Sequence, residues 1–405
     1  RASASMHNVE AEVVRMLLRQ ELISRSEITH ITGWSKAKTS QAIRALVNRR
    51  ILVEAGEGTS QGGRRPRLLG LNGQRGYIAG VDIGATSLAV ALADLRGVIL
   101  HEHSETADVR QPPEIFLRRA CELITGLIEG VGCQPEQVLA IGVGVPGPVD
   151  FERGELVAPP LMPEWENYSI RADFHAAFPA AAVIVDNDVN IMALGEQYAG
   201  DGAQVEHFIF VKIGTGIGAG IVSNGYVHRG SNGCAGDIGH ICVDKNGPLC
   251  RCGNTGCLEA MAAGPAIAEK AVVAARSGSS PILARLMEAN AGSLKPEDVN
   301  TACRVGDPAA LEIIRASGQM VGDVLAGLVN FFNPSHIFIG GGISNFDHHL
   351  LVAIRQAVLQ RSLPLATANL SINFSRLGAN SGITGAVALA RENLFLVQEN
   401  PFLSV

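Results

Sequence analysis

One short stretch of the chain holds a histidine and three cysteines whose spacing could bind a metal. The pattern is His240-x9-Cys250-x-Cys252-x4-Cys257. One imidazole and three thiolates suit tetrahedral zinc, and four protein ligands leave no position open for a reacting water. A redox-active cysteine cluster is the alternative, but the histidine and the turns at Gly253 and Gly256 favour a metal. The sequence therefore predicts a structural zinc ion, with Cys234 and Cys242 outside its ligand set.

Two acidic residues flank this predicted metal site. Asp237 lies three residues before His240, and Glu259 follows Cys257 closely. A bound metal would hold both carboxylates and the imidazole in one place, which suits hydrogen bonding to a polyol.

A second acidic group, Asp186-Asn187-Asp188, lies where a predicted strand (182–185) gives way to a helix. A carboxylate at such a junction could take the proton of a sugar hydroxyl that attacks a phosphate. The alternative is that Asp186 or Asp188 caps the following helix, and spacing alone favours that reading.

Glycine-rich turns follow three predicted strands. They are Asp82-Ile83-Gly84-Ala85-Thr86, the run from Gly214-Thr215-Gly216 to Gly220, and Gly340-Gly341-Gly342. Glycine lets backbone N–H groups approach phosphate oxygens, and threonine adds a hydroxyl donor. Together the turns predict a nucleotide-binding cleft.

These residues belong to an α/β body that begins near residue 77. Apolar alternation predicts strands within 77–105, at 138–145 and at 182–185, with a helix at about 113–130. The pattern recurs with strands within 207–228, at 335–339 and near 370–374. The sequence thus predicts a duplicated architecture of two similar lobes with a cleft between them, and a final helix (382–394) that packs back on the first lobe.

The N-terminal residues predict a separate helical head. Apolar spacing indicates a helix over 9–20, Ser24 and Glu27 form an S-x-x-E capping box, and a third helix starts at Ser35 after a turn at Gly33. Two helices joined by a short glycine turn make a helix-turn-helix. The predicted exposed side of the third helix offers donors to a DNA major groove: Lys36, Lys38, Thr39, Ser40, Gln41 and Arg44.

A basic loop follows the third helix. Predicted strands at 51–54 and 68–71 flank a glycine-rich and arginine-rich segment, in which Arg64, Arg65 and Arg67 could enter a minor groove as a wing. Residues 1–70 carry 12 basic and 6 acidic side chains, whereas the rest of the chain carries 21 and 33. A small three-helix bundle with a solvated basic face is the alternative, but the charge asymmetry favours DNA binding.

Composition excludes several classes of protein. Of 405 residues, 47% are hydrophobic and 18% are charged, which excludes disorder as the main state. No apolar run reaches the ~18 residues of a membrane helix, and no secretory signal is evident. The cysteines form no disulfide framework, so we expect a cytoplasmic protein.

The motifs resemble those of the ROK family (repressors, open reading frames, kinases) over residues 8 to 395. The resemblance rests on Gly144-Val145-Pro146-Gly147, Asp186 to Asn190, Ala235 to His240, and Cys250 to Glu259. It implies a winged helix-turn-helix joined to a two-lobed, actin-like sugar-kinase (ribonuclease H-like) body. The implied domains are 8–71, then 76–189 with 382–397, then 190–381 with the zinc site.

The resemblance also implies roles for individual residues. Asn187, Asp188, Asp237, His240 and Glu259 match sugar contacts, and Asp188 matches the general base of the kinases. His240, Cys250, Cys252 and Cys257 match zinc ligands. The nucleotide site is matched by Asp82, Gly84, Thr86, Gly214, Thr215, Gly216 and Gly340 to Gly342.

Two departures from the family pattern bear on activity. Asp237 stands where family kinases usually have Glu, which withdraws the carboxylate by roughly 1.5 Å. Gly84-Ala85-Thr86-Ser87 replaces the usual Gly-Gly-Thr-Lys, which weakens the ATP site.

The sequence favours a sugar-responsive repressor of carbohydrate uptake or catabolism genes. It would bind operator DNA as a homodimer or tetramer and respond to a sugar or sugar phosphate, with no membrane contact. One alternative is a sugar kinase that uses ATP and Mg²⁺ and also binds DNA. The other is a regulator controlled by a protein partner, for example a transport component.

Overall fold

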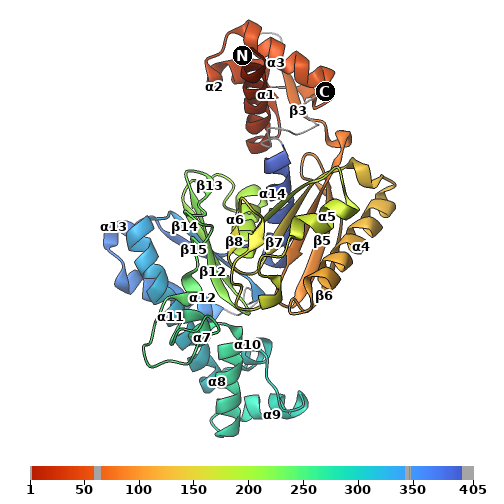
Figure 1. The fold of residues 1–405 in the computed structure, drawn as a ribbon. Coiled ribbons are helices and arrows are strands. Elements are labelled where there is room, and N and C mark those ends of the chain that lie inside the picture. Colours follow the sequence, from red (N-terminus) through yellow and green to blue (C-terminus); the bar gives the residue numbers. More distant parts are fainter. Residues whose placement is uncertain (1, 59–64, 343–345, 347, 395–405) are drawn as a thin grey trace. The chain divides into compact units, whose positions relative to one another are not determined.

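The computed structural model describes residues 2–58, 65–342, 346 and 348–394 (Figure 1). Contacts divide the chain into two compact units. Unit 1 contains 1–143, 169–185 and 386–405, and unit 2 contains 144–168 and 186–385. The head clusters with the first lobe, so the predicted division into three domains remains a prediction.

The head combines helices with a three-stranded sheet. The helices are α1 (Ala2–Arg19), α2 (Arg25–Thr32) and α3 (Lys36–Asn48), and the sheet has the order β1-β3-β2, with β1 Ile23–Ser24, β2 Leu52–Glu57 and β3 Arg67–Leu71. The predicted capping box is present: Ser24 Oγ accepts from the Glu27 N–H at 3.2 Å, and Glu27 Oε2 accepts from the Ser24 N–H at 2.7 Å. Hydrogen bonds to the Glu27 carboxylate from the side chain and the backbone of Ser24 lower its pKa. The helix-turn-helix and the two wing strands are therefore as predicted, and the loop 59–64 lies outside the described residues.

The remainder of unit 1 is built on a five-stranded sheet of order β10-β7-β4-β5-β6. Its strands are β4 (Tyr77–Ile83), β5 (Ser87–Asp94), β6 (Ile99–Thr106), β7 (Val138–Val145) and β10 (Ala182–Asn187). Figure 1 shows α4 (Pro113–Val131) along this sheet, with α5 (Ile170–Ala177) as its neighbour. One apolar stripe of α4, which includes Phe116, Ala120 and Ile124, is buried.

Unit 2 repeats the same strand arrangement. Its sheet has the order β13-β12-β11-β14-β15, formed by β11 (Phe208–Ile213), β12 (Ile217–Ser223), β13 (Tyr226–Val227), β14 (His336–Gly340) and β15 (Ser371–Phe374). In both sheets the third, second, first, fourth and fifth strands along the chain lie in that order. The predicted duplication is therefore confirmed. The short strands β8 (Val149–Asp150) and β9 (Glu155–Leu156) pair with each other.

Both faces of the sheet in unit 2 are buried, because side chains alternate along each strand. Ile209, Val211 and Ile213 of β11 face a core that includes α11 (Pro308–Phe332) and α12 (His348–Arg361). Phe208 and Phe210 face the opposite side and pack with α6 (Asp188–Ala199). This packing fixes the N-terminus of α6 beside the sheet.

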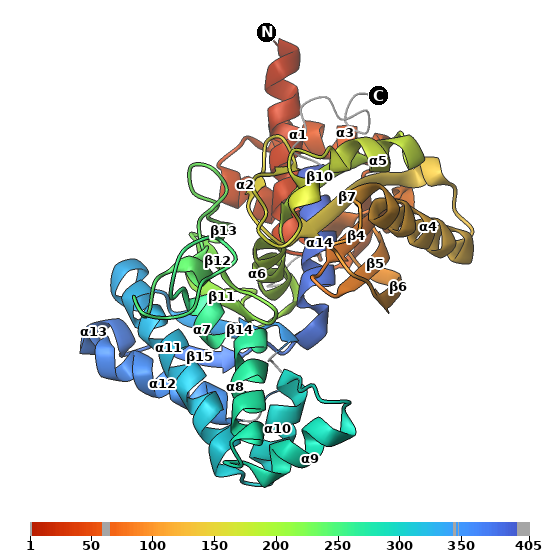
Figure 2. The same ribbon diagram turned by 60° about the horizontal axis from the view of Figure 1, so that its bottom comes forward.

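A helical segment lies between β13 and β14, and the sequence analysis did not resolve it. It contains α7 (Leu258–Ala262), α8 (Gly264–Arg276), α9 (Pro281–Ala289), α10 (Pro296–Arg304) and α11, and α13 (Pro364–Thr367) follows α12. Proline in the first turn starts α8, α9, α10 and α11, where its missing N–H costs nothing. Figure 2 shows α8, α9 and α10 packed together.

The last helix, α14 (Ser381–Leu394), contributes to both units. In unit 2, a Cβ at Gly385 would lie 1.6 Å from the carbonyl oxygen of Ile191 in α6. In unit 1, a Cβ at Gly142 of β7 would lie 2.1 Å from the carbonyl oxygen of Ala386. Glycine at these positions is what lets the backbones approach so closely. Among the described residues, none of the helices has both the length and the apolar character that a membrane span needs.

Candidate functional site

The predicted zinc ligands lie together in unit 2. The ligand atoms of His240, Cys250, Cys252 and Cys257 are all within 4.8 Å of one another. The sulfurs of Cys252 and Cys257 are 3.7 Å apart, and Cys250 Sγ lies 3.6 Å from His240 Nδ1. In a tetrahedral zinc site the sulfurs lie at about 2.3 Å and the nitrogen at about 2.0 Å from the metal. Two such sulfurs are then roughly 3.8 Å apart, and a sulfur and the nitrogen are roughly 3.5 Å apart. Donor types and spacing thus fit the zinc-binding motif expected for this cluster.

Backbone contacts hold the cysteine loop in shape. Cys250 N donates to the Asn254 carbonyl at 2.7 Å, and the backbones of Cys242 and Cys257 form an isolated antiparallel β-bridge. Burial raises the pKa of the Cys257 thiol to about 12, and the neighbouring thiols add to this shift. The raised pKa favours the protonated thiol. Because a dication stabilises thiolates, metal binding would instead favour the deprotonated form. Cys234 and Cys242 are exposed and do not belong to the cluster.

His240 connects the metal cluster to the predicted sugar contacts. Its Nδ1 faces the thiols, while its Nε2 lies 3.8 Å from Asp237 Oδ1. Gly236 brings this loop onto β12: its φ is +96°, and a Cβ there would lie 1.8 Å from the Ala219 carbonyl oxygen. Glu259, in the first turn of α7, accepts from the Ile217 N–H at 3.1 Å. Asp237, His240 and Glu259 are thus gathered along β12.

Asn187 and Asp188 lie at the N-terminus of α6. The helix cap is Asn187, whose Oδ1 accepts from the Val189 N–H at 2.9 Å and whose Nδ2 donates to the Gly147 carbonyl at 2.8 Å. The expectation that Asp186 or Asp188 caps this helix is therefore wrong. Asn fits the position because its short side chain can accept from the backbone of the first turn and donate elsewhere.

Asp186 is buried and fully engaged. Its Oδ2 accepts from the Arg229 guanidinium at 2.9 and 2.8 Å. Its Oδ1 accepts from the Asn187 N–H at 2.8 Å and from Asn190 Nδ2 at 2.9 Å. Arg229 also stacks on Phe151, 4.0 Å from the ring centroid. This network holds the strand-to-helix junction that presents Asn187 and Asp188.

Strand β12 connects the two groups of predicted sugar contacts. A Cβ at Gly218 would touch the side chain of Val189 in α6 at 2.9 Å. At the start of the same strand, a Cβ at Gly216 would lie 2.5 Å from Glu259 Oε2. Asn187, Asp188, Asp237, His240 and Glu259 therefore all lie around one strand of unit 2.

Two residues of this region were missed by sequence reasoning. Lys212 of β11 forms an ion pair with Asp188, and Arg229 binds Asp186. The signal for Lys212 was available, because it is the charged residue in an otherwise apolar strand, Phe-Ile-Phe-Val-Lys-Ile. Arg229 lies in a loop, and its sequence neighbours give no comparable signal.

The predicted nucleotide turns are divided between the units. Asp82, Gly84 and Thr86 lie at the β4–β5 turn of unit 1, where the Gly84 N–H donates to the Ser87 carbonyl at 2.9 Å. Gly214, Thr215 and Gly216 join β11 to β12, and Gly340 to Gly342 end β14, which is the parallel neighbour of β11. A Cβ at Gly214 would lie 3.4 Å from the Gly342 nitrogen, so the two turns of unit 2 meet. The nucleotide assignment stays a prediction.

The predicted DNA face of α3 needs one correction. Lys36, Lys38, Gln41 and Arg44 are exposed, and Ser40 is half-buried. Thr39 is only 1% exposed, and its hydroxyl accepts from Thr29 at 3.2 Å. The reason is helical spacing, since Thr39 continues the buried stripe of Ala42, Ile43 and Leu46.

The basic residues of the head are partly neutralised within it. Arg67 pairs with Glu54 at 2.5 Å, and Arg65 lies 4.0 Å from Glu57. Lys38 lies over the Trp34 ring at 4.7 Å. Arg64 lies outside the described residues.

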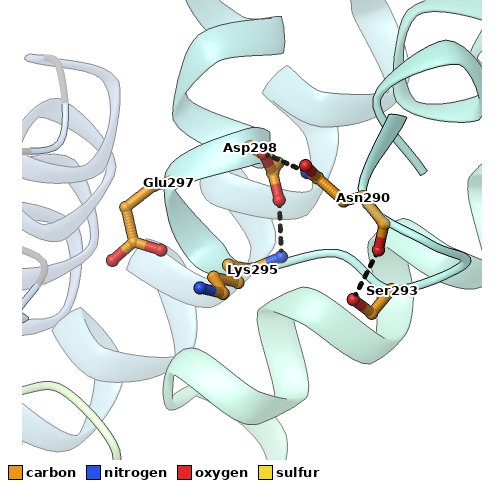
Figure 3. A pocket seen from close by; sticks show the side chains of 5 residues that line it. All are labelled: Asn290, Ser293, Lys295, Glu297 and Asp298. Carbon is orange, nitrogen blue, oxygen red and sulfur yellow. Dashed lines mark hydrogen bonds between the residues drawn. The ribbon is translucent and has the colours of Figure 1, made fainter. Parts of the chain in front are cut away.

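An open depression between α9 and α10 contains none of the predicted site residues (Figure 3). Its polar groups bind one another: Asp298 accepts from Asn290 Nδ2 at 3.0 Å and from the Lys295 N–H at 2.8 Å, and Ser293 donates to the Asn290 carbonyl. These contacts stabilise the turn into α10, and we assign no ligand there.

Comparison with known proteins identifies relatives of two kinds. The chain is 30% identical over 387 residues to a xylose repressor of Caldicellulosiruptor bescii, which covers 96% of each chain. It is 33% identical over 320 residues to a glucokinase of Thermotoga maritima, which covers 78% of this chain and 98% of the glucokinase. Among solved structures, a ROK family transcriptional regulator described as a homologue of the E. coli MLC protein is 27% identical, covers 95% of both chains and has a TM-score of 0.79.

The family pattern covers most of the chain. The defining pattern of the ROK family matches residues 78–393, which span the sheets of both units, the metal cluster and the candidate sugar contacts. We conclude that this chain belongs to the ROK family.

Proposed function

We propose that the protein is a cytoplasmic, sugar-responsive transcriptional regulator that represses carbohydrate uptake or catabolism genes. One observation carries the proposal: the chain joins a helix-turn-helix head to a ROK body. The xylose repressor matches both parts, whereas the glucokinase leaves about a fifth of this chain unmatched. That fifth is about the size of the head with the C-terminal residues.

The head supplies the DNA contacts. The exposed face of α3 offers Lys36, Gln41 and Arg44 to a major groove. Arg65 and Arg67 would exchange Glu57 and Glu54 for phosphates, which costs little because exposed ion pairs contribute little to stability. Two heads of a homodimer or tetramer would bind half-sites of a pseudo-palindromic operator.

The body supplies the sugar contacts. Asn187, Asp188, Asp237, His240 and Glu259 offer several acceptors in one region, as a polyol requires. Zinc bound by His240, Cys250, Cys252 and Cys257 would fix the imidazole and the loop that carries Asp237, and it would take no part in chemistry because its coordination is complete. Sugar binding would shift the DNA affinity to the extent that it favours one conformation of the protein.

Fluorescence anisotropy on the upstream DNA of the gene, titrated with a panel of sugars at fixed salt, tests the proposal. Arg44→Ala should weaken DNA binding, reduce the salt dependence by about one counterion and leave sugar affinity unchanged. Glu259→Gln should weaken the sugar response at least tenfold without changing DNA affinity in the absence of sugar. The control is Arg315→Ala, an exposed arginine of α11, which should change neither.

Each failure has a distinct meaning. Absence of specific DNA binding refutes the proposal. Tight DNA binding that responds to none of the sugars points to control by a protein partner, such as a transport component.

A sugar kinase is the second candidate, because the glucokinase relative is 33% identical and the family resemblance implies that Asp188 is a general base. It predicts sugar-dependent release of ADP from ATP and Mg²⁺ that disappears in Asp188→Asn.

A further inference from the structure

Lys212 carries a charged ammonium group in a strand whose other residues are buried. Its neighbours along β11, Phe208 to Val211 and Ile213, are all buried. The side chain of Lys212 is 20% exposed and that of Asp188 is 7% exposed. A charge in such surroundings is stable only when it is paired, and the Nζ of Lys212 is bound to Oδ2 of Asp188.

The strand pairing brings this ion pair into the candidate sugar site. Lys212 lies opposite Gly218 of β12, and Gly218 contacts Val189, the residue after Asp188. The ammonium therefore lies between β12, which carries the contacts to Glu259 and the Asp237 loop, and the first turn of α6.

The neighbouring carboxylate cannot take over the role of Asp188. Both oxygens of Asp186 accept two hydrogen bonds each, from Arg229 on one side and from Asn187 and Asn190 on the other. Asp188 is thus the carboxylate at this junction that we expect to meet a ligand hydroxyl, through Oδ1, since its Oδ2 binds Lys212.

We propose that Lys212 is a positioning residue that makes Asp188 a sugar-binding group and withholds it as a base. This inference rests on the proposed function. In phosphoryl transfer the sugar hydroxyl would give its proton to Asp188, its oxygen would bond to the γ-phosphorus of ATP, and the bond from that phosphorus to ADP would break.

Protonation of Asp188 would cancel the negative charge that pairs with the mostly buried ammonium of Lys212, so the ammonium disfavours that protonation. The intact pair instead presents a donor and an acceptor side by side, which suits two neighbouring hydroxyls of a sugar. Lys212 therefore separates sugar sensing from sugar phosphorylation in this chain.

The test measures sugar-dependent ADP release with ATP and Mg²⁺, and sugar affinity by calorimetry, for the full-length protein. The sugars are D-glucose, D-xylose and N-acetylglucosamine. The wild type should bind one of them and release ADP no faster with it than without it. Lys212→Thr should raise sugar-dependent ADP release at least tenfold, and Lys212→Gln, which keeps a neutral donor in case the threonine variant does not fold, should do the same.

Three further variants separate positioning from structure. Lys212→Arg keeps the charge and should show no sugar-dependent ADP release. Adding Asp188→Asn to Lys212→Thr should abolish the gain. Lys270→Met removes another partly buried ammonium of unit 2, one that donates to the Met261 carbonyl at 2.6 Å, and should match the wild type.

Two outcomes overturn the inference. In the first, the wild type releases ADP in a sugar-dependent way and Lys212→Thr lowers that rate. In the second, the variants at position 212 bind sugar but release ADP only at the background rate. The DNA-binding assay keeps the two proposals distinct. If sugar changes the DNA affinity of the protein but the variants at position 212 release no ADP, only the role of Lys212 is refuted. If those variants release ADP but sugar leaves the DNA affinity unchanged, only the proposed regulator function is refuted.

Discussion

Replacing Arg229 by Met should destabilise unit 2 substantially, because Asp186 would lose the guanidinium that donates two hydrogen bonds to its Oδ2. The Asp186 side chain is 2% exposed and that of Arg229 is 24% exposed. Removing one partner of a buried pair costs about 3–5 kcal/mol. Since Arg229 is partly solvated and Asp186 keeps the Asn187 and Asn190 hydrogen bonds, we expect the lower end, about 3 kcal/mol. That corresponds to roughly a hundredfold change in the unfolding equilibrium.

Urea denaturation followed by tryptophan fluorescence can isolate unit 2. The chain has two tryptophans: Trp165, fully buried in unit 2, and Trp34 in the head. In a Trp34→Phe background the signal therefore reports on unit 2. At a slope of about 3 kcal/mol per M, the midpoint should fall by about 1 M in urea.

Two further variants decide whether the charge is the cause. Asp186→Asn combined with Arg229→Met removes the unpaired charge at position 186 and should recover part of the lost stability. Arg315→Met breaks the exposed bidentate pair with Glu312 and should leave the midpoint unchanged. If Arg229→Met shifts the midpoint no more than Arg315→Met does, the structural role assigned to the Asp186 network is wrong.

Three other perturbations follow from the structure. Because burial raises the pKa of Cys257 to about 12, the metal-free Cys257 thiol stays protonated near neutral pH, so zinc uptake should release its proton and the apparent zinc affinity should rise with pH; a pH-independent affinity would contradict this. Gly385→Ala places a methyl group where the Ile191 carbonyl lies, and should lower the melting temperature or abolish soluble expression, whereas Gly327→Ala, with open space around it, should be tolerated. Arg391→Met removes the hydrogen bond to the Leu17 carbonyl (3.3 Å), and should weaken the sugar response of DNA binding while sugar affinity is retained; an unchanged response would exclude this contact from the coupling.

Much of the fold could be predicted from local patterns. Ser24 and Glu27 define a helix start through short-range hydrogen bonds, and the alternating apolar residues of β11 define a strand without reference to distant residues. The metal cluster was equally predictable, because its ligands lie within 18 residues of one another and share one chemistry.

Other features depend on tertiary packing. Thr39 reads as an exposed polar residue of α3, but the buried stripe decides its place. Asn187 caps α6, whereas Asp186 binds Arg229, which lies 43 residues later, and Asp188 binds Lys212. The pairing of Lys212 with Asp188 likewise requires β11 and α6 to be packed together, and no local pattern reports that.

The shared helix α14 has a consequence for synthesis of the chain. The glycine at 142 in β7 is made early, yet the helix that covers it begins at residue 381. Unit 1 is thus assembled from three separated segments, the last of which is synthesised after all of unit 2. While the ribosome makes the body, that face of β7 stays uncovered, so a nascent or truncated chain has an incomplete first lobe. Unit 1 can therefore complete its fold only after unit 2 has been synthesised.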